Sequence, residues 1–168
     1  MDYGYGNGSA AGLGIILAVF AIEAGIIALA YVVEYILYGV ALMLFFRKVG
    51  IDPRIAWIPV YRFWKWYEVG GQPGWWSIIG LVPYANIAAS VFLCIGMWHT
   101  GKAFGKDAGM LVLGIFLPFV WLFVLASRNE VYRPEWVTAA GFPPPLAGYG
   151  SLQYAAAHPE APNRPAAA

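Results

Sequence analysis

Three long apolar stretches, separated by shorter polar stretches that contain glycine and proline, make up most of the chain up to residue 126. A membrane-spanning helix needs about 20 consecutive, mostly apolar residues. The pattern therefore predicts an all-α fold, an integral membrane helical bundle with about three transmembrane helices. The predicted membrane domain covers residues 11–127, and its spans lie at about residues 22–46, 77–98 and 109–126.

The first apolar stretch, Ala11 to Phe46, is long for one span and short for two. Its 36 residues contain no Lys or Arg, and as one helix they would extend about 54 Å at about 1.5 Å per residue. No proline or Asn-Gly pair interrupts them, so a tight turn is not favoured. We interpret the stretch as one long or bent helix after a short outer segment at residues 1–10, with two short segments as the alternative.

Tryptophan and proline mark the second and third stretches. Trp75 and Trp76 precede the second stretch and Trp98 closes it, as expected of side chains at a membrane interface. Pro83 lies in the first third of this stretch, and Pro118 lies near the middle of the third. Because proline removes a helical hydrogen bond, we expect Pro83 to kink the second helix.

The segment between the first two spans, residues 50–74, is aromatic, basic and interrupted by Pro59. Arg62 and Lys65 make it too charged to cross a membrane. We expect a broken amphipathic helix at the interface, where tryptophans lie at the depth of the lipid headgroups. The predicted interfacial anchors are Trp57, Arg62, Trp64, Lys65, Trp66, Trp75 and Trp76.

Composition supports lipid as part of the solvent. Charged residues make up 11% of the chain and hydrophobic residues 61%, whereas soluble domains carry about 25% charged residues. The formal net charge of +1 provides no field for a polyanion, so no nucleic-acid partner is expected. The single cysteine, Cys94, has no partner in the chain for a disulfide.

Basic residues indicate an orientation for the three predicted spans. The first loop holds five of them, the second loop two and the residues after the third span three. With the N-terminus outside, eight basic residues lie inside and two outside, in agreement with the positive-inside rule. We therefore expect a multi-pass protein of the plasma (inner) membrane, with Lys65 and the C-terminus cytoplasmic and Lys102 outside.

The residues after the third span, 128–168, are rich in proline and alanine. Such a composition does not bury enough apolar surface to offset the loss of chain entropy. We expect a flexible cytoplasmic tail.

A short pattern occurs three times: a polar glycine turn, an apolar stretch, and then a proline between apolar or aromatic residues. Internal repeats of this kind occur in membrane proteins with pseudo-symmetry. The spacing is irregular, so coincidence among proline-containing helices is an equally good explanation. The turns lie at residues 50–53, 71–74 and 105–107, and the proline steps at 58–61, 82–84 and 117–119.

A family resemblance rests on the same part of the chain. The motifs, in order, are Phe-Arg-Lys-Val-Gly (46–50), Trp-Ile-Pro-Val-Tyr (57–61), Gly-Gly-Gln-Pro-Gly-Trp-Trp (70–76), Leu-Val-Pro-Tyr-Ala-Asn-Ile (81–87) and Phe-Gly-Lys (104–106). Residues 40–126 resemble a family of small bacterial integral membrane proteins of unknown function. They are also similar to the membrane-embedded N-terminal module of some type I signal peptidases. The resemblance implies a membrane module of several helices and no activity, and Arg62 stands where the family pattern has Asn.

Catalytic and metal chemistry find no support in the sequence. A signal peptidase needs a serine beside a buried lysine base, but no lysine lies inside a predicted span near Ser77 or Ser90. His99 and His158 are 59 residues apart, so they form no clustered ligand set. We read His99 as an interfacial side chain and expect no catalytic residues, no metal site and no cofactor.

Polar residues inside the predicted spans are the candidate functional residues. Glu23 and Glu34 are 11 residues apart, which places them within about 20° on one helix face and about 16 Å apart along the axis. Ionisable groups in a membrane face a partner, a cavity or a proton path. Tyr84 and Asn86, on either side of Ala85, form a second polar focus.

Two classes of function follow, besides an export accessory suggested by the signal-peptidase resemblance. The first is a non-enzymatic membrane protein that acts by association, as an accessory subunit of a larger complex or a self-assembling scaffold. Its expected partners are the lipid bilayer and another protein or a second copy, because small residues allow close helix approach. The second is a small transporter or channel that uses Glu23 and Glu34.

Overall fold

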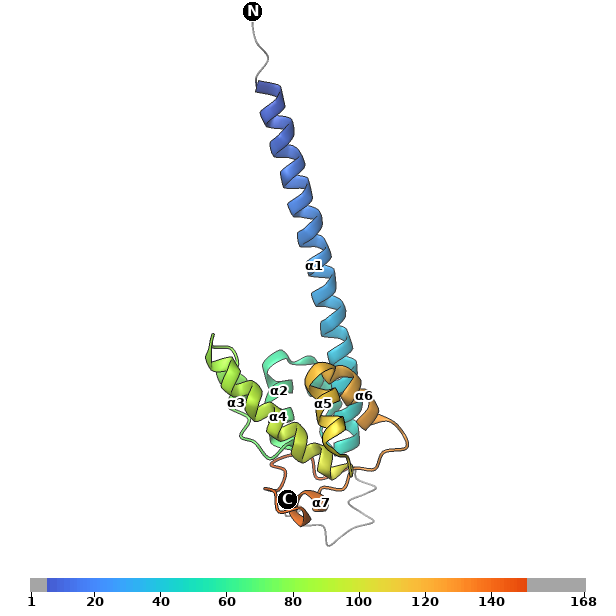
Figure 1. Cartoon of the computed structure of the whole chain (residues 1–168). Coiled ribbons are helices and arrows are strands. Elements are labelled where there is room, and N and C mark those ends of the chain that lie inside the picture. The colour runs from blue at the N-terminus through green and yellow to red at the C-terminus, as the bar shows by residue number, and fades with distance from the viewer. Residues whose placement is uncertain (1–5, 151–168) are drawn as a thin grey trace, which may run out of the picture. The chain divides into compact units, whose positions relative to one another are not determined.

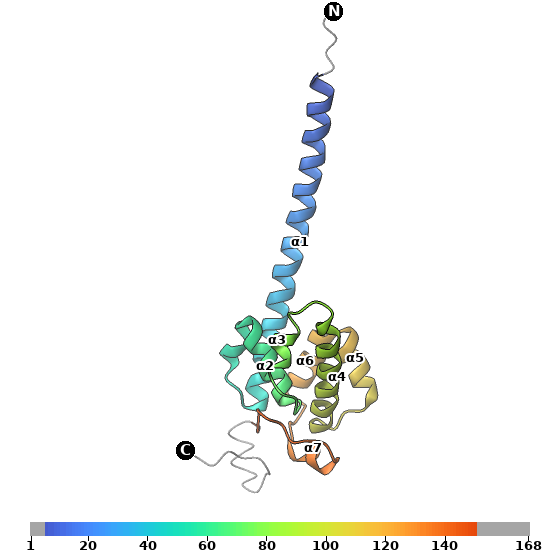
Figure 2. The same cartoon turned by 90° about the vertical axis from the view of Figure 1, so that its left-hand side faces the viewer.

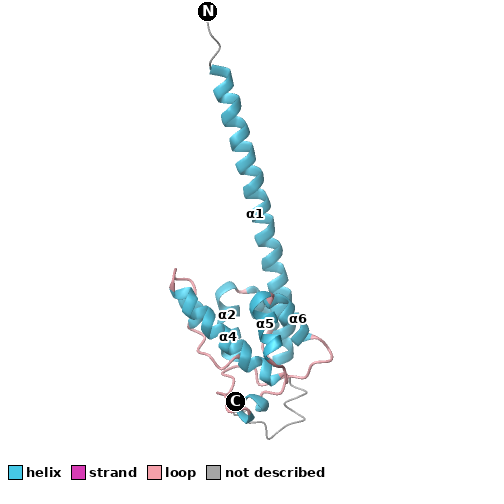
Figure 3. Ribbon diagram, viewed as in Figure 1, coloured by secondary structure: helices cyan, strands magenta, loops and turns pink. Residues whose placement is uncertain are grey.

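The computed structural model describes residues 6–150, and it divides the chain into two compact units, Met1–Leu37 and Tyr38–Ala168. Between residues 6 and 150 the chain forms helices and loops, with no strand (Figure 3). The expected all-α class is therefore confirmed. The expected bundle of three membrane spans is not confirmed, because only one helix among these residues is long and apolar enough to cross a membrane.

Helix α1, Gly6–Val49, is one uninterrupted helix. In unit 1 nearly all of its described side chains are exposed, and none of its most apolar 18-residue window, with a mean hydropathy of 2.5, is buried. Among the described residues, α1 alone is long and apolar enough to cross a membrane. Its last turns differ, because Leu42, Phe45 and Phe46 are fully buried in unit 2. The expected span at 22–46 is thus mostly exposed helix up to residue 37 and part of unit 2 from residue 38.

From the end of α1 to residue 150, unit 2 contains seven further helices, which Figures 1 and 2 show from two sides. Several are too short to cross a bilayer core of about 30 Å, since nine residues extend only about 14 Å. In chain order the helices are η1 (Pro53–Trp57), α2 (Pro59–Val69), α3 (Trp76–Ile79), α4 (Ala85–Ala103), α5 (Ala108–Phe116), α6 (Pro118–Ala126) and α7 (Glu135–Ala139).

Pro83 lies between two helices instead of kinking one, and Pro118 begins a new helix. Turns at residues 80–84 separate α3 from α4, and the non-helical residue Leu117 separates α5 from α6. Proline lacks an N–H and disfavours helical backbone in the residue before it, so a new helix begins at or just after it. The expected spans at 77–98 and 109–126 are each two helices.

Stacked aromatic rings form the centre of unit 2. The ring centroids of Trp66 (α2) and Trp121 (α6) are 6.4 Å apart, and Phe45 (α1) lies 6.2 Å from Trp121. Phe104, after α4, lies 6.3 Å from Phe45. These contacts join four segments that are distant in sequence, so the core fixes how the short helices are arranged.

The turns of unit 2 gather at two opposite ends (Figures 1 and 2). The apolar end consists of the three proline turns, residues 57–61, 81–84 and 115–119. The polar end consists of residues 47–50, 70–74, 104–107 and 127–150. Helices α3 and α4 form one hairpin with its apex at the apolar end, and α5 and α6 form another. The repeated sequence pattern thus corresponds to a repeated position in the fold.

The stretch expected to open a flexible tail packs against unit 2 as far as Gly150. Tyr132 and Val137 are buried, the Tyr132 hydroxyl donates to the carbonyl of Gly148 at 2.8 Å, and Gly150 N–H donates to Val49. The tail expectation is wrong for residues 128–150, because aromatic side chains and backbone hydrogen bonds offset the entropy of this proline-rich stretch. Residues 151–168 lie outside the described residues.

Candidate functional site

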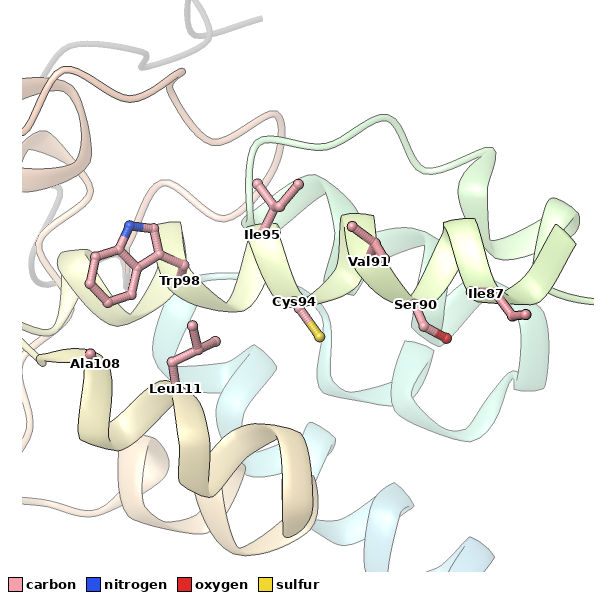
Figure 4. Close-up of a pocket in the computed structure, with 8 residues that line it drawn as sticks. All are labelled: Ile87, Ser90, Val91, Cys94, Ile95, Trp98, Ala108 and Leu111. Carbon is pink, nitrogen blue, oxygen red and sulfur yellow. The ribbon is translucent and has the colours of Figure 1, made fainter.

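A groove of about 760 Å³ lies between α4 and α5. Figure 4 shows Trp98 of α4 above Ala108 and Leu111 of α5. Apart from Ser90, Cys94 and the Trp98 indole, the lining side chains are apolar, so the groove suits an apolar chain better than a charged substrate. The lining residues are Ile87, Ser90, Val91, Cys94, Ile95, Trp98, Ala108 and Leu111.

The two small polar groups of this groove are not activated for nucleophilic chemistry. Burial raises the pKa of the Cys94 thiol, so the reactive thiolate is disfavoured at neutral pH. The Ser90 hydroxyl donates to the backbone carbonyl of Asn86 at 2.8 Å, and none of the described residues that line the groove is a base that could take its proton.

A smaller pocket of about 290 Å³ brings together Tyr67, Ser77, Asn86 and Ser90. The Tyr67 hydroxyl donates to the Ala89 carbonyl at 2.8 Å, and burial raises the pKa of Tyr67 to about 12. The Ser77 hydroxyl is buried with no hydrogen-bond partner among the described residues. No His, Asp, Glu or Lys lines this pocket, so its lining pairs neither serine with a base.

Glu130 is the centre of an ionic cluster at the polar end. Lys106 Nζ lies 2.6 Å from its carboxylate, and Lys48 Nζ donates to its backbone carbonyl at 2.6 Å and to the carbonyl of Ser127. Lys48 therefore caps backbone carbonyls just beyond α6, while Lys106 supplies the positive charge that balances the Glu130 carboxylate.

This cluster does not support the topology expected from the sequence. Three spans would place the loop with Lys102 and Lys106 outside and the segments with Lys48 and Glu130 inside. In the structure Lys106 and Lys48 both bind Glu130, so these loops lie at one end of unit 2. The reason is the proline turns, which send α4 and α6 back toward the end from which α3 and α5 start.

A second polar cluster surrounds the end of α2. The Glu68 carboxylate accepts hydrogen bonds from Trp64 Nε1 and Lys65 Nζ, both at 2.7 Å, and its carbonyl accepts the N–H of Leu146. Burial alone would lower the pKa of Lys65, but the hydrogen bond and charge of Glu68, together with the Tyr61 side chain, outweigh burial and hold that pKa above its ordinary value. Glu68 therefore ties α2 to the chain that follows α7.

His99 belongs to the same region and is not interfacial, as the sequence had suggested. Its side chain is 6% exposed, its ring stacks on Phe142 at 4.7 Å, and its Nδ1 lies 3.0 Å from the Gly70 carbonyl. Because a carbonyl only accepts, Nδ1 is the protonated nitrogen. His99 is thus a buried residue that links α4 to the end of α2.

Glu23 and Glu34 lie on the exposed part of α1 in unit 1. Tyr84 and Asn86 belong to unit 2, where Tyr84 precedes α4 and Asn86 lies in its first turn, both exposed. Because the two glutamates and the Tyr84–Asn86 pair belong to different units, we assign them to no common site.

The predicted interfacial anchors lie in different environments in the structure. Trp57 is exposed at the apolar end with its ring against Gly39, and Trp64 is tied to Glu68. Trp75 and Trp76 stack on each other at 4.5 Å, and Trp76 also stacks on Phe92 at 4.0 Å.

Two of these anchors lie inside unit 2. Trp66 is a core residue that stacks on Trp121 and Phe63, so it contacts no lipid headgroup. Arg62 is 8% exposed with its guanidinium 5.0 Å from the Phe63 ring centroid. The cause is helical periodicity: residues 62 and 66 are four apart on the inward face of α2, whereas Lys65 lies on its outer side.

Sequence reasoning missed the structural importance of Glu68, Glu130 and His99. Glu68 follows Trp64 by four residues and Lys65 by three, which is a helical pairing signal. Glu130 and His99 depend on partners distant in sequence, and no local pattern indicates them. Within the described part of the chain, no three His, Cys, Asp or Glu side chains are grouped to hold a metal ion.

The comparison with known protein families concerns unit 2. Residues 55–134 match the model of a family of unknown function, DUF5684. No curated protein and no solved structure matches the chain. The matched region contains all three proline turns and both hairpins. The family resemblance expected from the sequence is thus supported as a likeness of unit 2 to a family without an assigned function.

Proposed function

We propose that this protein is a non-enzymatic integral membrane protein that acts by association. The exposed part of α1 crosses the bilayer and holds unit 2 at the cytoplasmic side, and α1 pairs with a second copy of the chain. The observation that carries the anchor is the exposure of α1, since none of its most apolar 18-residue window is buried.

The exposed part of α1 has the right length for one span. Residues 12–37 would extend about 39 Å as a helix, which covers a hydrocarbon core of about 30 Å. The basic residues support one orientation, because all ten Lys and Arg follow residue 46 and none precedes it. By the positive-inside rule, unit 2 lies on the cytoplasmic side and the residues before the span lie outside.

Glu23 and Glu34 support association through α1. Both are exposed on α1 and lie on nearly the same face. An ionisable side chain facing lipid is unfavourable and normally meets a partner. A second copy of α1, with the same two carboxylates, allows them to share protons and hydrogen bonds across the helix pair.

Extraction tests the anchor. We expect the full-length chain to stay with membranes washed in alkaline carbonate and to be released by mild detergent. Release by carbonate alone would contradict a membrane-spanning α1.

Disulfide cross-linking tests the pairing in a Cys94→Ala background. Ala30 lies between Glu23 and Glu34 on their face, about 20° from Glu23, whereas Val32 lies on the opposite face, about 180° from Glu23. We expect Ala30→Cys to give predominantly cross-linked dimer on mild oxidation in membranes, and the matched Val32→Cys to stay monomeric. Equal cross-linking of both, or of neither, would contradict pairing through this face.

Transport is the second candidate function, and the same two carboxylates favour it, because they form a polar line along one helix face. Flux of protons or monovalent cations into proteoliposomes should then fall in Glu34→Gln relative to the unchanged chain. Equal flux in both proteins, or none in either, would exclude this function.

A further inference from the structure

We infer that the apolar end of unit 2 inserts into the lipid leaflet on its own side of the membrane, as a set of three proline-containing apices that enter and leave at the same face. This inference rests on the proposed membrane anchoring by α1. It assigns a lipid-binding surface to unit 2, which the anchor alone does not require.

Exposed apolar side chains are concentrated at the apolar end. Tyr84 is 88% exposed and Phe116 is 77% exposed, values far above those of ordinary surface aromatics, whose rings are mostly covered. Contiguous exposed apolar surface of this kind marks a site of contact with protein or membrane. The exposed members are Trp57, Ile58, Val60, Tyr61, Leu81, Val82, Tyr84, Ile115, Phe116 and Leu117.

Charge separates the two ends of unit 2. The three segments of the apolar end, 57–61, 81–84 and 115–119, contain no charged residue. The polar end contains Glu130 and the two lysines that donate to it, Lys48 and Lys106, together with Arg128 and Arg133. This polarity is that of a domain with one end in hydrocarbon and the other in water, with basic side chains on the cytoplasmic side.

Backbone chemistry at the apices also suits lipid. Each apex contains a proline, Pro59, Pro83 or Pro118, which has no N–H to satisfy. The N–H groups of Arg62 and Trp121 are bonded back to Ile58 and Leu117, and Asn86 N–H is bonded to Val82. Lipid-exposed irregular backbone does not occur within the hydrocarbon region, so these apices suit the boundary of headgroups and acyl chains.

Continuity of the chain argues for lipid over a protein as the occupant. Tyr38, the first residue of unit 2, lies at the apolar end, because its ring is 6.3 Å from that of Phe119. Gly39 there contacts Trp57. Since the residues before Tyr38 form the proposed span, the chain enters unit 2 from the membrane at this same end.

Charged residues along α2 set the depth. Arg62 and Lys65 follow Pro59 by three and six residues, about 5 Å and 9 Å along the helix. Arg62 is buried and Lys65 is paired with Glu68, so neither requires deep hydrocarbon contact. Insertion by about 5–10 Å, to the boundary of headgroups and acyl chains, satisfies both.

Depth-dependent quenching tests the insertion on the full-length chain in proteoliposomes, in a Cys94→Ala background. Single cysteines at Val82 and Val131 carry a nitrobenzoxadiazole label. The pair is matched, since both are valines of unit 2, 53% and 51% exposed, at the apolar and polar ends respectively. A third label at Ile27, in α1, reports on the anchor itself.

We expect lipids with a doxyl group on the acyl chain to quench most of the Val82→Cys emission and little of the Val131→Cys emission, and aqueous iodide to do the reverse. A Val82 label open to iodide, as at Val131, would overturn the insertion. A Val82 label protected from both quenchers would overturn it in favour of a protein partner. Quenching of the Ile27 label by the same lipids tests the membrane anchor separately. If these lipids do not quench the Ile27 label, the result contradicts the proposed function and not the insertion of the apolar end.

Discussion

Tyr84 combines two unusual properties at the scale of a single residue. Its backbone has φ 66° and ψ −38°, the only positive φ of a non-glycine residue in the described part of the chain, and its side chain is almost fully exposed. Such a conformation costs about 1–3 kcal/mol and persists where the surrounding structure imposes it. The turn at Pro83 therefore holds an aromatic ring outward at the expense of stability.

Replacing Tyr84 by glycine separates the two properties. We expect Tyr84→Gly to stabilise unit 2 by about 1 kcal/mol, because glycine adopts positive φ without strain and the exposed ring contributes little packing. Urea unfolding in mild detergent measures this change. Val82→Gly is the control, since Val82 has no such strain, and it should destabilise; equal loss in both variants would contradict the strain at Tyr84.

Tyr132 fastens the chain after α7. Its buried hydroxyl donates to the Gly148 carbonyl at 2.8 Å, so Tyr132→Phe should lower the free energy of unfolding by about 1 kcal/mol by leaving a buried acceptor unsatisfied. Tyr149→Phe removes an exposed bond of the same type, to Leu146, and should change stability little. Proteolysis after residue 140 should increase only in Tyr132→Phe.

At the scale of elements, α2 and α4 meet through two glycines. A Cβ on Gly70 would lie 2.3 Å from Gly96 Cα and would clash with the backbone there. A Cβ on Gly96 would lie 3.4 Å from Gly70 Cα, which is an ordinary contact. The close approach positions Gly70 for its bond with His99.

The asymmetry of this contact gives a matched pair of variants. Gly70→Ala should destabilise unit 2 by about 1–3 kcal/mol, because the clash is with backbone and relief requires the helices to separate. Gly96→Ala should be close to neutral, since its added methyl group meets ordinary contacts and alanine favours helix. Thermal unfolding followed by circular dichroism compares them, and equal effects would contradict the close approach of α2 and α4.

At the scale of the whole molecule, the loops of the polar end lie together, so we expect all of them on the same side of the membrane. Single cysteines at Lys102 and Ser127, in a Cys94→Ala background, test this arrangement. Neither should react with a membrane-impermeant maleimide in intact cells, and both should react in inverted vesicles. Labelling of the Lys102 position from outside, with Ser127 protected, would restore three spans and contradict the hairpin arrangement.

The sequence by itself determined what depends on local composition. It predicted the all-α class, because long apolar stretches favour helix, and it predicted one long or bent helix over residues 11–46, with two short segments as the alternative, because nothing there terminates it. It also predicted a break at Pro59 and a kink at Pro83, and it indicated a recurring proline step at residues 58–61, 82–84 and 117–119, because proline acts on its immediate neighbours.

Only the tertiary structure decided what depends on partners distant in sequence. An apolar stretch reads the same whether it faces lipid or protein, so Phe45, Phe46 and Trp66 looked like membrane or interface residues and are core residues. Whether a proline kinks a span or reverses the chain depends on what the next helix packs against, so Pro83 and Pro118 became hairpin apices. The sequence placed Lys106 and Lys48 in loops on opposite sides of the membrane, but both bind Glu130. Their positions follow from the packing of α4, α5 and α6, which no local pattern encodes.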